Sequence, residues 1–171
     1  MLPEYAAAHL GLRSERWETS TAMRGSLEYH VLERDGRALH SARCGSGGAP
    51  LVLFHGVLRS WPTFLPLLPH FAWRMPIWAL DHRGHGQSSD ARDGACYRVA
   101  DYAEDAVDWL RQVVGQRAVV VGHSLGAMVA LAAAAQAPDR VEAVILEDPP
   151  FDTMGERIHS SGFHEYFSVI S

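Results

Sequence analysis

Gly122-His123-Ser124-Leu125-Gly126 is the stretch of sequence that decides the fold. The apolar residues 118–121 precede it and the alanine-rich residues 127–137 follow it, which predicts a strand, a sharp turn and a helix. The glycines remove side chains that would collide in so tight a turn, which holds the Ser124 hydroxyl out at the carboxyl end of the strand. The helix N-terminus directs free N–H groups at the same place. This context predicts a nucleophilic serine; the alternative is a serine that only caps the helix.

Apolar runs alternate with helical patterns along the rest of the chain. The Asp35-Gly36 pair predicts a hairpin turn between the first two strands. The later apolar strands are separated by helices, which indicates a parallel sheet covered on both faces, an α/β fold. Ligands of such sheets bind beyond the carboxyl ends of the strands. Strands are predicted at residues 27–32, 38–42, 51–54, 75–80, 118–121 and 141–146, and helices at residues 61–71, 101–114 and 124–136.

The predicted helix at residues 101–114 has an amphipathic pattern. Its apolar residues stand at positions 102, 106, 109, 110 and 113, and its acids at positions 101, 104, 105 and 108. We therefore expect a buried apolar face and a solvated acidic face. Asp101 and Glu104 also lie near the positive end of this helix.

Length, composition and charge limit the classes of protein. The chain has 171 residues, of which 47% are hydrophobic and 20% charged, which predicts one globular domain or part of one. A net charge of -5 without a basic run argues against nucleic acid or an anionic membrane as a partner. Cys44 and Cys96 suggest neither a disulfide framework nor a metal site. No signal-peptide pattern or long apolar run is present, so we expect a cytoplasmic protein. The oligomeric state stays open.

Four motifs, in the same order, make this chain resemble the α/β-hydrolase superfamily. That superfamily includes esterases, lactonases, carbon–carbon bond hydrolases, cofactor-free haloperoxidase-like enzymes, epoxide hydrolases and haloalkane dehalogenases. The resemblance covers residues 27–150 and implies a three-layer α/β sandwich with a mostly parallel sheet. A serine at the turn, rather than an aspartate, disfavours the epoxide hydrolase and dehalogenase branches. The motifs are His55-Gly56, Asp81-His82-Arg83-Gly84-His85-Gly86-Gln87-Ser88, the pentapeptide around Ser124, and Glu147-Asp148-Pro149-Pro150.

The resemblance assigns roles to individual residues. It implies that the backbone N–H groups of Val57 and Leu125 form the oxyanion hole for a tetrahedral intermediate. Substrate contacts are predicted for His55, Gly56, Trp61 and Phe64 and for the later aromatic residues Phe163, Tyr166 and Phe167; packing is the alternative role for these aromatic residues, and His55 could be structural. The chemistry needs neither a metal nor an organic cofactor, and the expected partner is a small-molecule substrate.

The resemblance also implies that part of the catalytic machinery lies elsewhere. In the superfamily the triad runs nucleophile, acid, histidine, and the last two usually follow the seventh and eighth strands. We expect residues 1–26 to be an N-terminal extension, residues 27–150 the first part of the core, and residues 151–171 the start of a helical lid. The chain is then an N-terminal fragment that lacks the catalytic histidine. Glu147 and Asp148 are weaker candidates for the acid, because strand-end carboxylates often cap nearby N–H groups instead.

Histidines within the chain are poor candidates for the base. A base must reach the serine oxygen by a hydrogen bond, whereas these histidines fall in turns, in the oxyanion loop or in the last residues. The sequence predicts a hydrolase of small or medium-sized apolar ester-like or related carbonyl substrates. The alternatives are a non-catalytic small-molecule binding module and an inactive truncated fragment whose sixth strand is an exposed apolar edge. The histidines considered are His55, His82, His85, His123, His159 and His164.

Overall fold

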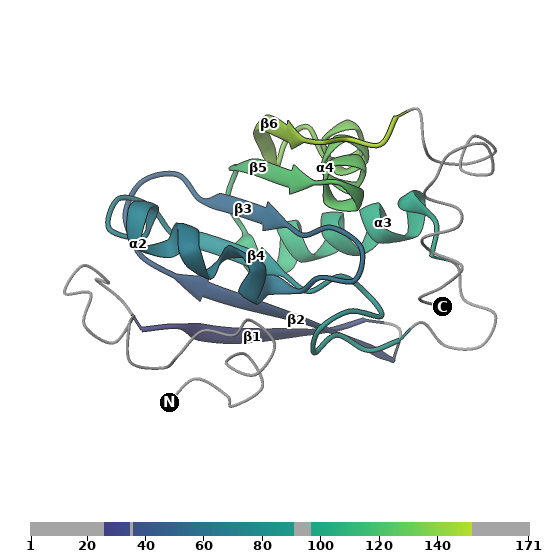
Figure 1. Ribbon diagram of the computed structural model, residues 1–171, viewed down its shortest axis with the longest axis horizontal. Coiled ribbons are helices and arrows are strands. Elements are labelled where there is room, and N and C mark those ends of the chain that lie inside the picture. Colours follow the sequence, from purple (N-terminus) through teal and green to yellow (C-terminus); the bar gives the residue numbers. More distant parts are fainter. Residues whose placement is uncertain (1–25, 35, 91–96, 152–171) are drawn as a thin grey trace.

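The computed structural model describes residues 26–34, 36–90 and 97–151 and places six strands in one sheet (Figure 1). The spatial order is β1-β2-β4-β3-β5-β6. β1 and β2 pair antiparallel, β2 pairs antiparallel with β4, and the pairs β4–β3, β3–β5 and β5–β6 are parallel. This arrangement confirms the predicted α/β fold with a mostly parallel sheet. The strands are β1 (Glu28–Arg34), β2 (Arg37–Cys44), β3 (Leu51–Phe54), β4 (Ile77–Leu80), β5 (Ala118–His123) and β6 (Val141–Glu147).

Helices cover both faces of the sheet. Successive side chains of a strand point to opposite faces, so Phe54 of β3 joins the hydrophobic cluster with α3 and α4, whereas Leu53 joins the cluster with η1 and α2. Figure 1 shows α3 and α4 behind the strands and α2 in front. The result is the three-layer sandwich that the sequence predicted. The helical segments are η1 (Trp61–Leu67), α2 (Leu68–Phe71), α3 (Val99–Trp109), η2 (Leu110–Val114) and α4 (Leu125–Gln136).

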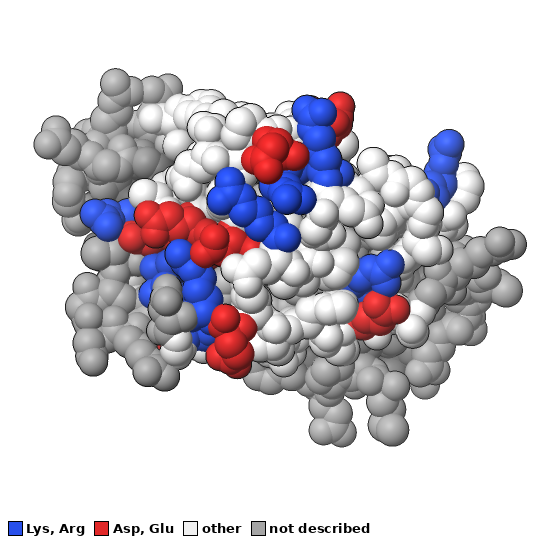
Figure 2. Space-filling model, turned by 180° about the vertical axis from the view of Figure 1, so that it is seen from behind, with Lys and Arg blue, Asp and Glu red and all other residues white. Residues whose placement is uncertain are grey.

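Acidic and basic side chains lie side by side on the surface. Figure 2 shows them interleaved on one face of the molecule, where neither sign forms a continuous field. Ion pairs such as Arg117 with Glu142, 3.0 Å apart, contribute to this pattern. Over the described ranges, no helix combines the length and the apolar character needed to cross a bilayer.

The predicted helix at residues 61–71 is less regular than expected. It forms a 3-10 segment, η1, followed by the four-residue helix α2. Pro62, Pro66 and Pro69 lack the backbone N–H that a continuous α-helix needs, which explains the interruption. The segment still buries Trp61 and Phe64 against the sheet.

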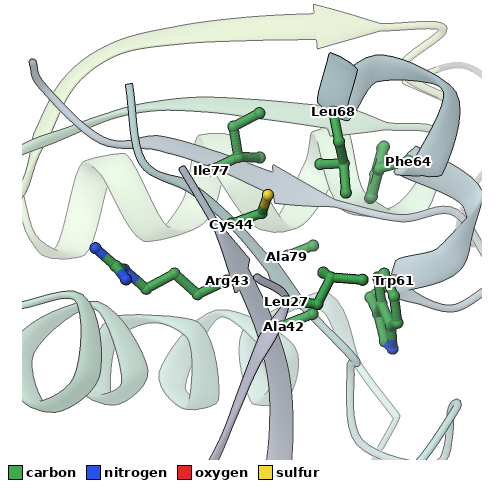
Figure 3. A pocket seen from close by; sticks show the side chains of 9 residues that line it. All are labelled: Leu27, Ala42, Arg43, Cys44, Trp61, Phe64, Leu68, Ile77 and Ala79. Atoms are coloured by element: carbon green, nitrogen blue, oxygen red, sulfur yellow. The ribbon is translucent and has the colours of Figure 1, made fainter. Parts of the chain in front are cut away.

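A small pocket lies beneath this segment (Figure 3). Trp61 and Phe64 of η1 face Ala79 of β4 across it, and Cys44 pairs with Ile77 at the amino-terminal end of β4. The lining residues of the pocket are Leu27, Ala42, Arg43, Cys44, Trp61, Phe64, Leu68, Ile77 and Ala79.

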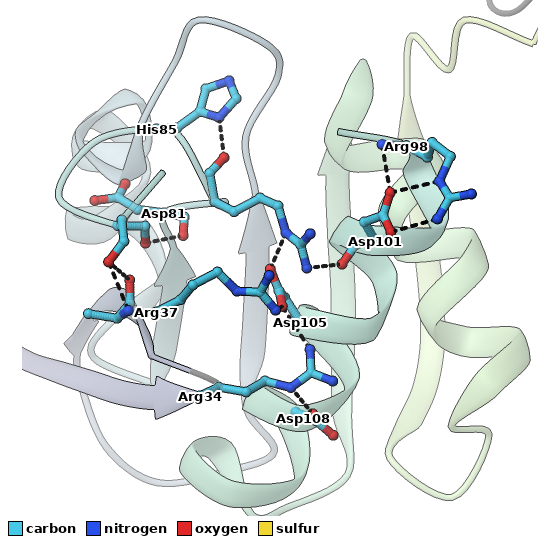
Figure 4. Close-up of polar contacts among 12 residues, drawn as sticks. Arg34, Arg37, Asp81, His85, Arg98, Asp101, Asp105 and Asp108 are labelled. Carbon is cyan, nitrogen blue, oxygen red and sulfur yellow. Dashed lines mark hydrogen bonds and ion pairs between the residues drawn. The ribbon is translucent and has the colours of Figure 1, made fainter. Parts of the chain in front are cut away.

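The predicted solvated face of the helix at residues 101–114 is wrong in part. The segment begins at Val99, and Asp101 and Asp105 are buried; only 2% of Asp105 is exposed. The Asp105 carboxylate accepts hydrogen bonds from Arg83 Nε at 2.6 Å and Arg34 Nη1 at 2.8 Å (Figure 4). Two guanidinium groups from distant segments therefore replace the water that the pattern predicted around this acid.

Candidate active site

Ser124 forms the sharp turn between β5 and α4, as the sequence predicted. Its backbone has φ 52° and ψ −115°, a region that non-glycine residues rarely adopt and that costs about 1–3 kcal/mol. Its N–H donates to the Glu147 carbonyl at 2.9 Å, and its own carbonyl accepts from Ala127 N at 3.0 Å. Both neighbouring elements therefore hold the turn in this conformation.

Two glycines allow the turn to pack this tightly. A Cβ on Gly122 would lie 2.6 Å from Ala127 N, and a Cβ on Gly126 would lie 2.7 Å from the His55 carbonyl oxygen. Real Cβ atoms do not approach other atoms so closely, so larger residues would push α4 away from β5 and from the end of β3. The Gly-x-Ser-x-Gly spacing is thus explained by packing around Ser124.

The His55-Gly56 segment lies directly against this turn. A Cβ on Gly56 would lie 3.3 Å from the Ser124 Cβ and 2.8 Å from His123 Nδ1. In the part of the chain that the structure describes, the backbone N–H of Val57 donates to no backbone acceptor, and the N–H of Leu125, the first residue of α4, has no partner within the helix. Two unpaired donors therefore accompany Ser124, which is the arrangement expected where negative charge develops on a ligand oxygen.

His55 is fully buried and both of its ring nitrogens are occupied. Nδ1 lies 2.8 Å from the Gly56 carbonyl oxygen, and Nε2 lies 3.1 Å from the backbone N of His82. Because the His82 N–H can only donate, Nε2 must accept, and the ring proton belongs on Nδ1. Burial lowers the pKa of His55 from 6.5 to about 4, so the ring is neutral near pH 7. It can orient the loop, and its side chain is enclosed away from solvent.

The other described histidines do not approach Ser124 by a hydrogen bond. Burial lowers the pKa of His82 well below its usual value, and its Nε2 has no hydrogen-bond partner among the described residues. His85 Nδ1 lies 2.9 Å from the Arg83 carbonyl oxygen. His123 packs against Gly56. The candidates His159 and His164 lie outside the described residues.

Asp81 organises the loop that follows β4. Its carboxylate accepts hydrogen bonds from Trp61 N at 2.7 Å and Gln87 N at 3.0 Å, and it lies 3.1 Å from His40 Nδ1. The Ser88 hydroxyl donates to the Asp81 carbonyl at 2.6 Å. Such buried, charge-assisted hydrogen bonds fix a loop in place.

Arg83, within this loop, joins it to α3. Arg83 Nε donates to Asp105, and Arg83 Nη2 donates to the Asp101 carbonyl at 2.8 Å. Burial alone would lower the pKa of Arg83, but the hydrogen bond and the charge of Asp105 outweigh it and raise the pKa. The local sequence pattern predicts no individual role for Arg83 or Ser88, although both belong to the motif that begins at Asp81.

The remaining predicted site residues are distributed as follows. Glu147 and Asp148 are exposed at the end of β6, and Asp148 has φ 48°. Trp61 and Phe64 lie in the hydrophobic cluster under η1. Phe163, Tyr166 and Phe167 lie outside the described residues. Nowhere in the described ranges do three or more His, Cys, Asp or Glu side chains gather in a group that could hold a metal ion.

Comparison with known proteins places this geometry among hydrolases. A family model described as alpha/beta hydrolase fold matches residues 49–163. The chain is 40% identical over 103 residues to 2-(acetamidomethylene)succinate hydrolase of Mesorhizobium japonicum, a match that covers 60% of this chain and 36% of that protein. It is 33% identical to a serine hydrolase-like protein of Danio rerio, over 86% of this chain and 44% of that protein.

Further similarity extends to proteins named for other substrates and to solved structures. Epoxide hydrolase B of Mycobacterium tuberculosis is 36% identical over 63% of this chain and 31% of its own length. The crystal structure of Cfl2 from Burkholderia cenocepacia superposes with a TM-score of 0.68 at 27% identity, covering 77% of this chain and 45% of that chain. The chain thus spans less than half the length of these curated relatives.

Proposed function

The chain belongs to the α/β-hydrolase fold family, and from this premise we propose that it supplies the nucleophile and the oxyanion donors of a serine hydrolase. The observation that carries the proposal is the conformation of Ser124. Its φ of 52° is maintained at a cost, and the loop beside it presents an unpaired N–H group. Strain retained next to unpaired donors is typical of a site that reacts rather than one that only packs.

In the proposed reaction Ser124 Oγ attacks the carbonyl carbon of the substrate and gives its proton to a histidine base. The carbonyl oxygen becomes negative and accepts hydrogen bonds from the N–H groups of Val57 and Leu125. The base returns the proton to the leaving group, which leaves an acyl ester on Ser124. Water, deprotonated by the same base, then hydrolyses this ester and regenerates the serine.

The base is proposed to come from sequence outside the described residues, and the acid either from there or from the end of β6. The buried rings of His55 and His82 are poor candidates for the base. Burial lowers the pKa of both, which makes them weak proton acceptors, and both nitrogens of His55 are already hydrogen-bonded. The incomplete coverage of the relatives is consistent with a base contributed from elsewhere in the parent protein. Asp148 and Glu147 stay candidates for the acid because they follow β6 at the edge of the sheet that carries Ser124.

The proposed substrate is a small or medium-sized apolar molecule with an ester-like or related carbonyl group. Relatives named as hydrolases of a succinate derivative and of epoxides support hydrolysis of a small molecule. A serine at position 124 supports attack on a carbonyl over epoxide opening, since the epoxide hydrolase branch is expected to carry aspartate there. The cytoplasmic location and the lack of a nucleic-acid partner stay predictions.

Covalent labelling of the full product of the gene tests the proposal. A fluorophosphonate should label the wild-type protein on Ser124, and Ser124→Ala should abolish that label, because the probe bonds to the serine oxygen. Turnover of a substrate should also fall in this variant, by roughly 10⁴-fold or more. Ser46→Ala is the matched control, since Ser46 is an exposed loop serine. A protein that binds small molecules but shows no label would favour the non-catalytic binding module and overturn the proposal.

A further inference from the structure

We propose that His55 is a positioning residue that orients the peptide bond between Gly56 and Val57, and so aims the Val57 N–H at the substrate oxygen. This inference rests on the proposed function, because it names how one of the two oxyanion donors is held. The role is carried by two hydrogen bonds of a single buried imidazole, one on each ring nitrogen. The side chain acts through the backbone and does not touch the reacting atoms.

The peptide group between Gly56 and Val57 is held at its carbonyl oxygen. The Gly56 carbonyl and the Val57 N–H belong to the same peptide group, which is planar and trans, so they point in opposite directions. His55 Nδ1–H donates to that carbonyl at 2.8 Å, and the Arg59 N–H donates to the same oxygen at the longer distance of 3.2 Å. Fixing the carbonyl end therefore fixes the direction of the N–H end. A hydrogen bond accepted at the oxygen also polarises the amide and strengthens its N–H as a donor.

The tautomer of His55 is fixed by the hydrogen bond at its other ring nitrogen. Only the tautomer with the proton on Nδ1 can donate to the Gly56 carbonyl. The His82 N–H, 3.1 Å from Nε2, requires a lone pair there and so selects that tautomer. Because His55 is fully buried, no bulk water competes for either nitrogen. The loop after β4 thus dictates how the loop after β3 presents its free N–H.

The chain of donors continues into the sheet. The peptide that carries the His82 N–H also carries the Asp81 carbonyl, which accepts from the Ser88 hydroxyl at 2.6 Å. Ser88 Oγ in turn accepts from the His40 backbone N–H at 2.9 Å. All four hydrogen bonds donate in the same direction, from β2 toward Val57, so each strengthens the next. A ring that served only to fill space would not need this alignment.

The competing role for His55 is packing. Its ring centroid lies 4.5 Å from that of His82 and 5.2 Å from that of His85, so the imidazole also fills a cluster of rings. Two amide substitutions separate the roles, because each removes the ring but keeps one end of its hydrogen bonding. In His55→Asn the amide nitrogen stands near the Nδ1 position and can still donate to Gly56. In His55→Gln the terminal oxygen stands near the Nε2 position and can accept only from His82.

Nuclear magnetic resonance on the full product of the gene is the first test. We expect the Gly56 carbonyl-carbon and Val57 amide-nitrogen shifts of His55→Asn to stay close to the wild-type values, and those of His55→Gln to move away. Both variants lose the imidazole ring, so the ring's own effect on these shifts cancels in the comparison. His85→Gln is the control within the same ring cluster and should leave both shifts at their wild-type values. Equal displacement in the two His55 variants overturns the proposal.

The rate of acylation by the fluorophosphonate is the second test. Loss of one oxyanion donor lowers the rate by about 10²–10³-fold, so a misdirected Val57 N–H in His55→Gln should lower acylation by up to about 10²-fold. His55→Asn should recover most of that loss, and affinity for a substrate analogue should change in neither variant, because the donor acts in the transition state. Equal loss of acylation in both variants indicates packing and overturns the proposal.

The two tests also separate this inference from the proposed function. Absence of labelling in the wild-type protein overturns the proposed function, while the chemical shifts of the Gly56–Val57 peptide still decide whether His55 orients it. Labelling of Ser124 with identical shifts and rates in both His55 variants overturns the positioning role and leaves the proposed function intact.

Discussion

The ends of β4 and β5 lie at the same edge of the sheet but differ in how far their polar groups are hydrogen-bonded. After β4, the buried Asp81 carboxylate accepts hydrogen bonds from Trp61 N and Gln87 N and also lies against His40. After β5, within the described residues, the Ser124 hydroxyl has no hydrogen-bond partner and the neighbouring Leu125 N–H has no acceptor. The polar groups at the end of β4 are hydrogen-bonded, and we call this strand end saturated. Those at the end of β5 are not, and we call this strand end open.

This difference indicates which polar groups are available to bind a ligand. Saturated polar groups have little to offer a ligand, because a new partner would have to replace a hydrogen bond that already exists. Open groups at a rigid turn offer the most, because they need no rearrangement when a ligand arrives. Under the proposed function, the Asp81 loop is scaffold, the Ser124 turn is the reactive part, and His55 joins the two.

Breaking the Asp105 ion pair should have the largest effect on stability. Asp105→Asn removes the carboxylate that pairs with the guanidinium of Arg83, which is 4% exposed. Removing one partner of a buried pair costs about 3–5 kcal/mol, so we expect the free energy of unfolding to fall by that amount. Urea unfolding followed by circular dichroism measures it.

The control lies one helical turn further along α3. Asp108 is partly exposed and pairs with Arg34 Nε at 2.5 Å, so Asp108→Asn should cost no more than about 1 kcal/mol. Equal losses of stability in the two variants would show that both acids of α3 are solvated. The buried ion pair of Asp105 would then not stabilise the scaffold.

The burial of Asp105 also shows where the sequence stops being informative. Local rules predicted the alternation of strands and helices and the turn at Ser124, because periodicity and glycine placement act within a few residues. Asp105 follows a helical period that predicts exposure, but its partners Arg83 and Arg34 stand 22 and 71 residues away. No local pattern encodes such a pairing.

The candidate site divides along the same line. The strained turn and the glycine beside it could be predicted from Gly-x-Ser-x-Gly and His-Gly. The role of His55 could not, because it depends on the backbone N–H of His82, 27 residues away, which any residue at that position would provide. Trp61 and Phe64, predicted also as substrate contacts, lie in a proline-containing segment whose irregular packing the sequence does not specify.

Lowering the pH should reduce the free energy of unfolding, because His55 takes up a proton more readily in the unfolded chain than in the folded one. Its pKa is 6.5 in the unfolded chain and about 4 in the folded one, because burial lowers it, and the charge of His85 adds to this while the Gly56 carbonyl and the Asp81 carboxylate oppose it. Between these values the unfolded chain binds a proton that the folded chain does not. The free energy of unfolding therefore falls as pH drops from 6.5, by up to about 1.4 kcal/mol per pH unit for this group, and its share levels off below pH 4.

The variant His55→Asn isolates that contribution. The asparagine side chain at position 55 does not titrate, so the unfolding free energy of this variant should depend less steeply on pH between 6.5 and 4 than that of the wild type. Urea titrations at half-unit steps of pH measure both slopes. Parallel slopes would mean that His55 is solvated when folded, contrary to the saturated environment described above.

The smallest effect should come from the strain at the open strand end. Ser124→Gly removes the Cβ that makes a φ of 52° costly, so the relief of strain, about 1–3 kcal/mol, should exceed the 0.4–1 kcal/mol that glycine adds to the entropy of the unfolded chain. We expect a net rise of about 1 kcal/mol in the free energy of unfolding. The same variant loses its nucleophile, so stability and labelling should change in opposite directions.

Ser60→Gly provides the matched control for this last prediction. Ser60 precedes η1 with φ −153° and ψ 174°, an extended conformation that carries no strain, and its side chain makes no capping hydrogen bond. Glycine there should only raise the entropy of the unfolded chain and lower stability by about 0.4–1 kcal/mol. Opposite signs for the two serines would place the stored strain at Ser124. If both variants lose stability equally, the turn is relaxed, and the open strand end differs from the saturated one only in its hydrogen bonds.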